Sequence, residues 1–156
     1  MLLLSLHSAA ATRLPSIHIS EMARMSWGTV AIPPSGAQYI ELSPLNQSTH
    51  GTGQMLFGTP SRGVYKLSSS DGASGRPAAI TIDIADVSTG SAALTLDHFN
   101  GVYASMRIGA FPSPTLPMPA SAPGGTLLYL GARATVNSAM AAGSLAPTFD
   151  IDVIVN

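Results

Sequence analysis

The amino-acid sequence predicts an all-β protein, a two-sheet sandwich of about 8–10 short and mostly antiparallel strands. Turn residues recur every dozen residues or so along the chain, which favours short strands over helices. Several segments also alternate apolar and polar residues with the period of two that a half-buried strand requires. The alternation is clearest at the C-terminus, where one face of the last segment carries Phe149, Ile151, Val153 and Val155.

The N-terminal half contains four or more candidate strands. Residues 13–20 are expected to form an edge strand or an extended arm, because Pro15 lies near their start. Residues 22–32 follow, and Gly28 within them indicates a bulge or a close approach of backbones. The other expected elements are a strand at 38–42, a polar loop at 46–53, and strands at 54–58 and 64–67 that form a hairpin around a tight turn.

In the C-terminal half, Asn100-Gly101 is expected to be the hairpin turn between two strands. Residues 111–123 hold five prolines, so they are expected to be a stiff connection over the surface and neither a central strand nor a helix. The other expected elements are strands at 79–87, 92–99, 102–108, 126–137 and 148–156, with a turn at 137–145.

Composition limits the function classes. The 156 residues suit one domain, and a formal net charge of -1 with only 10% charged residues offers no electrostatic footprint for nucleic acid. The seven basic residues are scattered and no two are adjacent. The absence of cysteine excludes disulfides and thiolate chemistry. No apolar run approaches the roughly 18 residues needed to span a bilayer.

Two interpretations fit the N-terminus. Residues 1–11 combine a short leucine-rich run with an alanine-rich stretch, as in the tail of a secretory signal. Alternatively, they belong to an ordered arm in which Leu2, Leu4 and Leu6 share one face. We therefore divide the chain into residues 1–20, a signal-peptide remnant or an extended donor-type arm, and residues 21–156, a single sandwich domain. A neighbour's groove and the chain's own sheet are equally acceptable places for such an arm.

The order of several short motifs resembles the DUF4402 family of secreted bacterial proteins. The motifs are Trp27-Gly28-Thr29-Val30, the segment from Phe57-Gly58-Thr59-Pro60 to Tyr65-Lys66-Leu67, Leu94-Thr95-Leu96-Asp97-His98-Phe99, Gly125 to Val136, and Phe149 to the terminal Asn156. The resemblance covers roughly residues 11–156. The sequence departs from the family pattern at Leu145, Pro147 and Val155, where the family usually has Tyr, Gly and Tyr.

The resemblance implies an Ig-like β-sandwich, secretion to the cell surface and no enzyme activity. The family in turn resembles the wider group of spore-coat-U-like and fimbrial subunits, in which an N-terminal arm of one subunit adds a strand to the next. Such a protein has copies of itself as partners, with a periplasmic chaperone and an outer-membrane usher. The interface residues would be Leu2, Leu4, Leu6, Leu14, Ile17 and Ile19 in the arm, and Phe149, Ile151, Val153 and Val155 in an acceptor edge strand.

No catalytic, cofactor-binding or metal-ligating residues are expected. The chain has no Gly-x-Ser-x-Gly elbow, and its four histidines are far apart, without the spacing of metal ligands. Asp83 with Asp86, and Asp150 with Asp152, are carboxylate pairs that favour a solvated face over an ion site. The alternative function is an adhesin or carbohydrate-binding module, which needs an exposed aromatic platform. The four histidines are His7, His18, His50 and His98. The residues that could form an aromatic platform are Trp27, Tyr39, Tyr65, Tyr103 and Tyr129.

Overall fold

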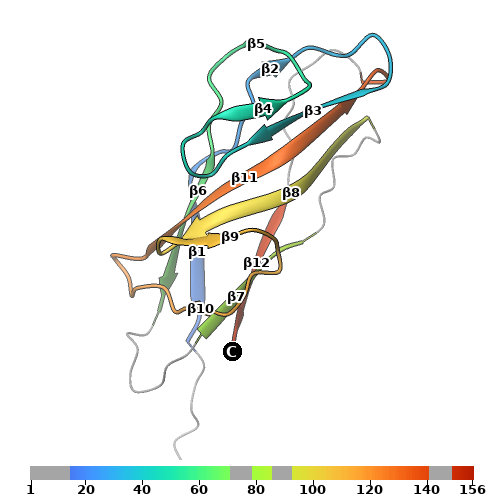
Figure 1. Ribbon diagram of the computed structural model, residues 1–156. Coiled ribbons are helices and arrows are strands. Elements are labelled where there is room, and N and C mark those ends of the chain that lie inside the picture. The colour runs from blue at the N-terminus through green and yellow to red at the C-terminus, as the bar shows by residue number, and fades with distance from the viewer. Residues whose placement is uncertain (1–14, 71–78, 86–92, 141–148) are drawn as a thin grey trace, which may run out of the picture.

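The computed structural model describes residues 15–70, 79–85, 93–140 and 149–156. Within them the protein is all-β, with twelve strands in antiparallel sheets that pack together as a β-sandwich (Figure 1). The fold class predicted from the alternation and the turn spacing is therefore confirmed. The larger sheet contains β1 (Ile17–Ala23), β3 (Ala37–Leu42), β4 (Thr49–Gly51), β6 (Gly63–Ser69), β8 (Leu94–Tyr103), β9 (Met106–Ile108) and β11 (Thr126–Asn137).

β11 is the strand around which the larger sheet is built. β8 pairs along one of its edges from Leu128 to Val136. On the other edge β6 pairs as far as Leu130, and β3 pairs from Arg133 onward. From Leu128 onward, inward side chains alternate with half-exposed ones, as expected for one buried and one solvated face. The inward side chains, all buried, are Leu128, Leu130, Ala132, Ala134 and Val136.

The exchange of partners on β11 takes place at Gly131 and Ala132. A Cβ atom on Gly131 would lie 2.0 Å from the backbone oxygen of Leu42, so only glycine lets the end of β3 approach this closely. Ala132 lies between the two ladders on that edge. Its carbonyl oxygen accepts a hydrogen bond from the buried indole Nε1 of Trp27, at 3.3 Å. The Trp27 side chain thus supplies a polar contact to β11 at the point where its partners on this edge change.

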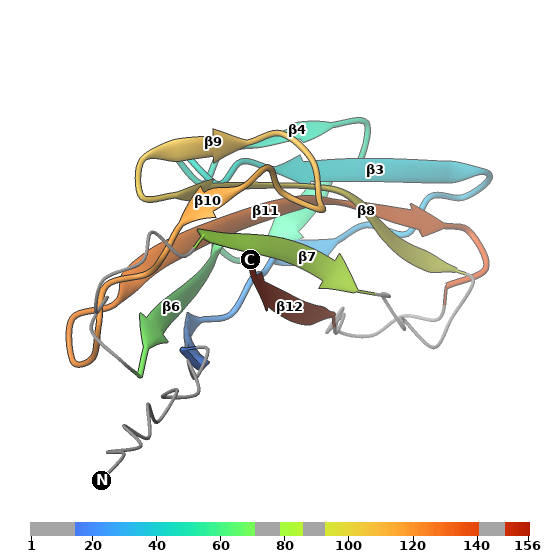
Figure 2. The same cartoon turned by 90° about the horizontal axis from the view of Figure 1, so that it is seen from below.

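A smaller sheet covers one end of the larger one. It contains β10 (Leu116–Pro117), β7 (Ala79–Ala85) and β12 (Asp150–Val155), and Figure 2 shows β7 and β12 beneath β3, β8 and β11 of the larger sheet. Beyond β10, Ser113 continues the pairing of β7. Its amide donates to the Ile82 oxygen at 2.7 Å, and its hydroxyl accepts from the Ile82 amide at 2.9 Å. A separate two-stranded ribbon joins β2 (Thr29–Val30) to β5 (Met55–Phe57).

The buried side chains form two clusters. The first lies around Trp27 under β3, β8 and β11, and the second lies between the larger and the smaller sheet. Gly28 confirms the expected close backbone approach, since its Cβ would lie 2.6 Å from the Phe57 oxygen. The first cluster consists of Met25, Trp27, Ile40, Leu42, Leu94, Leu96, Ala132, Ala134 and Val136. The second cluster consists of Tyr65, Leu67, Ile80, Ile82, Tyr103, Ile108, Leu116, Leu128 and Leu130.

Two predicted pairings were wrong. The strands around residues 55 and 65 do not form a hairpin, because β5 pairs with β2 while β6 pairs with β1 and β11. Asn100-Gly101 is not a turn but lies inside β8. The turn falls at Ala104-Ser105, whose φ angles of 47° and 68° suit the right-handed twist of a two-residue hairpin. Local turn composition had favoured the wrong positions in both cases, because long-range pairing decided the connections.

Two predicted loops also contain strands. The polar loop expected at 46–53 includes β4, which pairs with β3 through Leu42 and Thr49. The proline-rich connection includes β10, and its Leu116 is 1% exposed and belongs to the second cluster. β10 is an edge strand, where proline costs no ladder hydrogen bond. The expectation that this segment lies wholly on the surface was therefore wrong.

Candidate functional site

The predicted N-terminal arm is described from residue 15 onward, so Leu2, Leu4, Leu6 and Leu14 lie outside the described residues. Ile17 and Ile19 belong to β1, whose antiparallel partner is β6 of the same chain. Both side chains are half-buried and pack against the second cluster. This part of the arm therefore serves as the first strand of its own domain.

The predicted acceptor strand is β12 with the residue before it. Its alternation is confirmed: Ile151, Val153 and Val155 face the second cluster, and the side chains between them are exposed. The inward side chains are only half-buried, however. Phe149 packs between the two clusters, with its ring centroid 5.3 Å from that of Phe99 and 6.1 Å from that of Tyr65.

β1 and β12 lie on the same side of the sandwich, and each has one edge that no described strand pairs with. Within the described residues, β1 pairs only with β6 and β12 only with β7. Both strands pack half-buried apolar side chains on the second cluster, and both views show them on one side of the molecule (Figures 1 and 2). A free edge presents a row of unpaired backbone N–H and C=O groups. We call this region, from β1 to β12, the open side.

Three of the four aspartates from the predicted carboxylate pairs are described, and they lie on the outer face of the smaller sheet. Asp150 and Asp152 are exposed on β12, as expected, and Asp152 lies directly opposite Asp83 of β7. Asp83 uses its Oδ1 to accept from the Ile84 amide at 2.8 Å. Asp86 lies outside the described residues. In the part of the chain that is described, no group of three or more histidine or acidic side chains is placed to hold a metal ion.

The five Trp and Tyr residues do not form a platform. Trp27, Tyr65 and Tyr103 are buried in the two clusters. Tyr39 and Tyr129 lie half-exposed on the outer face, but an arginine covers each ring. The guanidinium of Arg133 lies 4.6 Å from the Tyr39 ring centroid and that of Arg62 lies 3.9 Å from the Tyr129 centroid.

A row of polar side chains crosses the outer face of the larger sheet. His50, Glu41, Arg133 and Asp97 occupy directly opposite positions on β4, β3, β11 and β8. Glu41 Oε2 lies 3.1 Å from Arg133 Nη2 and 3.6 Å from His50 Nε2. Arg133 Nη1 in turn lies 3.4 Å from His98 Nε2. His50 and His98, far apart in the sequence, are thus neighbours of the same ion pair. His18 is exposed on β1, and His7 is outside the described residues.

His98 is part of a β-bulge. Two residues of β8, His98 and Phe99, lie opposite the single residue Ala132 of β11. His98 adopts a φ of 48°, an uncommon value for a side chain other than glycine. The extra residue places Asp97 and His98 consecutively on the outer face and turns Phe99 inward. Bulges of this kind often re-aim side chains next to functional sites.

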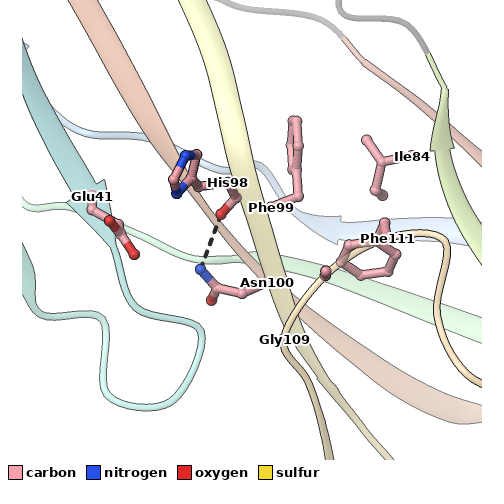
Figure 3. A pocket seen from close by; sticks show the side chains of 8 residues that line it. Glu41, Ile84, His98, Phe99, Asn100, Gly109 and Phe111 are labelled. Carbon is pink, nitrogen blue, oxygen red and sulfur yellow. Dashed lines mark hydrogen bonds between the residues drawn. The ribbon is translucent and has the colours of Figure 1, made fainter.

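A pocket of about 430 Å³ opens beside the bulge. Figure 3 shows its polar side chains, from Glu41, His98 and Asn100, on one side and Ile84 and Phe111 on the other. The rest of the lining comes from Phe99, Gly109 and Ala110. Sequence reasoning missed this site because its residues come from four separate segments. One signal was present: the polar pair Asp97-His98 interrupts the alternation that begins at Leu94 and Leu96.

Comparison with protein-family models finds no match, and comparisons with curated proteins and with solved structures find no significant one. Among the residues that the structure describes, no helix is long and apolar enough to cross a membrane.

Proposed function

We propose that the protein is a non-enzymatic structural subunit of an extracellular filament, pilus-like or fimbria-like, or of a coat, and that it assembles by β-strand addition. The observation that carries the proposal is the open side, where two free edges flank half-buried apolar side chains. The alternation of Leu2, Leu4 and Leu6 and the resemblance to the DUF4402 family also support it. Secretion, a chaperone and an usher belong to the same proposal.

In the proposed joint, the N-terminal arm of one copy pairs with a free edge on the open side of the next copy. Backbone hydrogen bonds would complete the edge, and the leucines on one face of the arm would cover side chains such as Ile151 and Val153. Burial of apolar surface contributes about 25 cal/mol per Å². β1 pairs with β6 of its own domain, so we assign the donor segment to residues 1–14 and not to Ile17 and Ile19.

Deletion of residues 1–14 is the first test. Because β1 begins at Ile17, the truncated chain retains every strand that the structure describes, and it should remain folded but monomeric. Negative-stain imaging and size-exclusion chromatography would compare it with the full chain, with circular dichroism to check the fold. Filaments formed by the truncated chain would refute the proposed joint.

The alternation of the arm allows a matched pair of variants. Leu4→Ser changes the face shared with Leu2 and Leu6, whereas Leu3→Ser changes the opposite face by the same substitution. Leu4→Ser should slow or prevent assembly, because a serine would then face the apolar groove, and Leu3→Ser should assemble nearly as the wild type does. Equal assembly rates by light scattering would show that the arm does not insert alternate side chains.

A further inference from the structure

We propose that the pocket beside the β8 bulge binds a neutral saccharide unit. This inference does not rest on the proposed function, because the pocket is lined from β3, β7, β8 and the segment after β9, and none of its lining residues belongs to β1 or β12. Its volume of about 430 Å³ falls within the range of small-molecule sites. The aromatic platform considered from the sequence is not part of it.

Glu41, His98 and Asn100 form the polar wall of the pocket, and this wall is held in place before any ligand arrives. Arg133 fixes Glu41 through contacts of 3.1 and 3.4 Å to the same oxygen, Oε2. His50 also approaches Oε2, so Oε1 is the oxygen that the carboxylate offers to a ligand. Asn100 is oriented by the bond from its Nδ2 to the His98 carbonyl at 3.2 Å (Figure 3). Preorganised groups of this kind reduce the entropy lost on binding.

His98 adds a donor to this wall. A guanidinium has only donors, so in the contact between Arg133 Nη1 and His98 Nε2 the imidazole nitrogen must accept. A neutral imidazole then carries its proton on Nδ1 and can donate it. Together with the carboxylate and amide groups, the wall offers both donors and acceptors. Sugar hydroxyls, which donate and accept at once, match such a set.

Charge and the apolar wall narrow the class of ligand. The carboxylate of Glu41 is paired with Arg133, so the wall carries little net charge and favours a neutral ligand over an ion. Opposite it lie Phe111 and Ile84 (Figure 3). A pyranose ring has hydroxyls around its edge and apolar C–H groups on its faces, and it can therefore contact both walls. The strained φ of His98 is the conformational cost of presenting this wall.

The test is titration of the full chain with neutral hexoses and N-acetylhexosamines, as monosaccharides and disaccharides, followed by amide NMR shifts. At least one of these sugars should shift the amides of residues 98–100 and 109–111 selectively. Glu41→Gln should then weaken that sugar's affinity about tenfold or more, since a hydrogen bond to a charged group is lost. If none of the sugars shifts these amides, the proposal is overturned.

Two further variants show whether the sugar binds in this pocket. Glu21→Gln is the matched control, because Glu21 is also a strand carboxylate paired with an arginine, Arg24, but it lies outside the pocket. It should bind as the wild type does. Asn100→Ala removes a polar group without breaking the ion pair and should also weaken binding. Equal affinities for Glu41→Gln, Asn100→Ala and Glu21→Gln would place the sugar elsewhere and overturn the assignment.

Discussion

At the residue scale, Trp27 shows how one side chain can support a sheet at the point where strand partners change. Its indole is 2% exposed within the first cluster, and its Nε1 donates to the carbonyl of Ala132. That carbonyl lies where β11 exchanges β6 for β3. A hydrogen bond to a buried carbonyl replaces one that the group loses to water on folding. Trp27 thus contributes both apolar volume and one polar contact.

Substitution of Trp27 by Phe tests the polar contact. The variant keeps an aromatic ring in the first cluster but removes the donor, and the free energy of unfolding should fall by about 0.5–1.5 kcal/mol, the typical net contribution of one hydrogen bond. Urea denaturation followed by circular dichroism would measure it. Val30→Ala, a truncation at the partly buried margin of the same cluster, serves as a comparison for lost volume. An unchanged midpoint in Trp27→Phe would mean that the indole N–H contributes nothing.

At the element scale, β11 depends on one glycine. A straight strand flanked by a single partner on each edge has no such requirement. β11 has β6 and β3 end to end along one edge, and the second of them approaches so closely that Gly131 meets the backbone of Leu42 and Pro44. The atoms in the way belong to backbone and to a proline ring, which cannot rotate aside as a long side chain can.

Gly131→Ala should therefore be strongly destabilising. The added Cβ would lie 2.0 Å from the Leu42 oxygen, and relieving that contact must separate β3 from β11, at a cost of about 1–3 kcal/mol or more. Gly109→Ala is the matched control, since a Cβ there meets nothing within 4 Å, and its effect should stay within about 0.5 kcal/mol. Thermal melting of both variants would show the difference, and equal melting temperatures would contradict this account of β11.

Individual strands could be predicted from the sequence better than their pairing. The alternation around Ile80 and Ile82, and again from Ile151 to Val155, predicted β7 and β12 with their buried faces. The hairpin assigned to β5 and β6 was wrong because pairing depends on contacts between distant segments, which local turn residues do not encode. The polar pocket was missed for the same reason. Its polar and apolar walls meet only when β3, β7 and β8 are assembled.

At the scale of the whole molecule, Tyr65 lies where the layers meet. It belongs to the second cluster, and its ring packs edge-on against Phe149, which contacts both clusters. Burial, and secondarily the negative charge of Glu21, raises the pKa of the Tyr65 hydroxyl from 10.0 to about 12. Burial also raises the pKa of Tyr103 in the same cluster. The packing between the two sheets therefore opposes the ionisation of both phenols.

The raised pKa of Tyr65 predicts that the folded protein loses stability at alkaline pH. Between pH 10.0 and about 12 the unfolded chain loses the Tyr65 proton while the folded chain keeps it, so the free energy of unfolding should fall as pH rises through this window. Below that window both states are protonated and this residue adds no pH dependence. Tyr65→Phe should show a shallower decline in urea midpoints, with the part due to Tyr103 remaining. An identical decline in the variant would contradict the raised pKa.

The sequence by itself determined that the chain forms strands and which face of several strands is buried, because alternation with period two is a local property of consecutive residues. Only the tertiary structure decided which strands pair, where β11 exchanges partners, and that His50 and His98 approach one ion pair. These features depend on distant segments meeting under the competing demands of burial and hydrogen bonding. Within the described residues, the same competition leaves β1 and β12 each with a free edge beside a shared core.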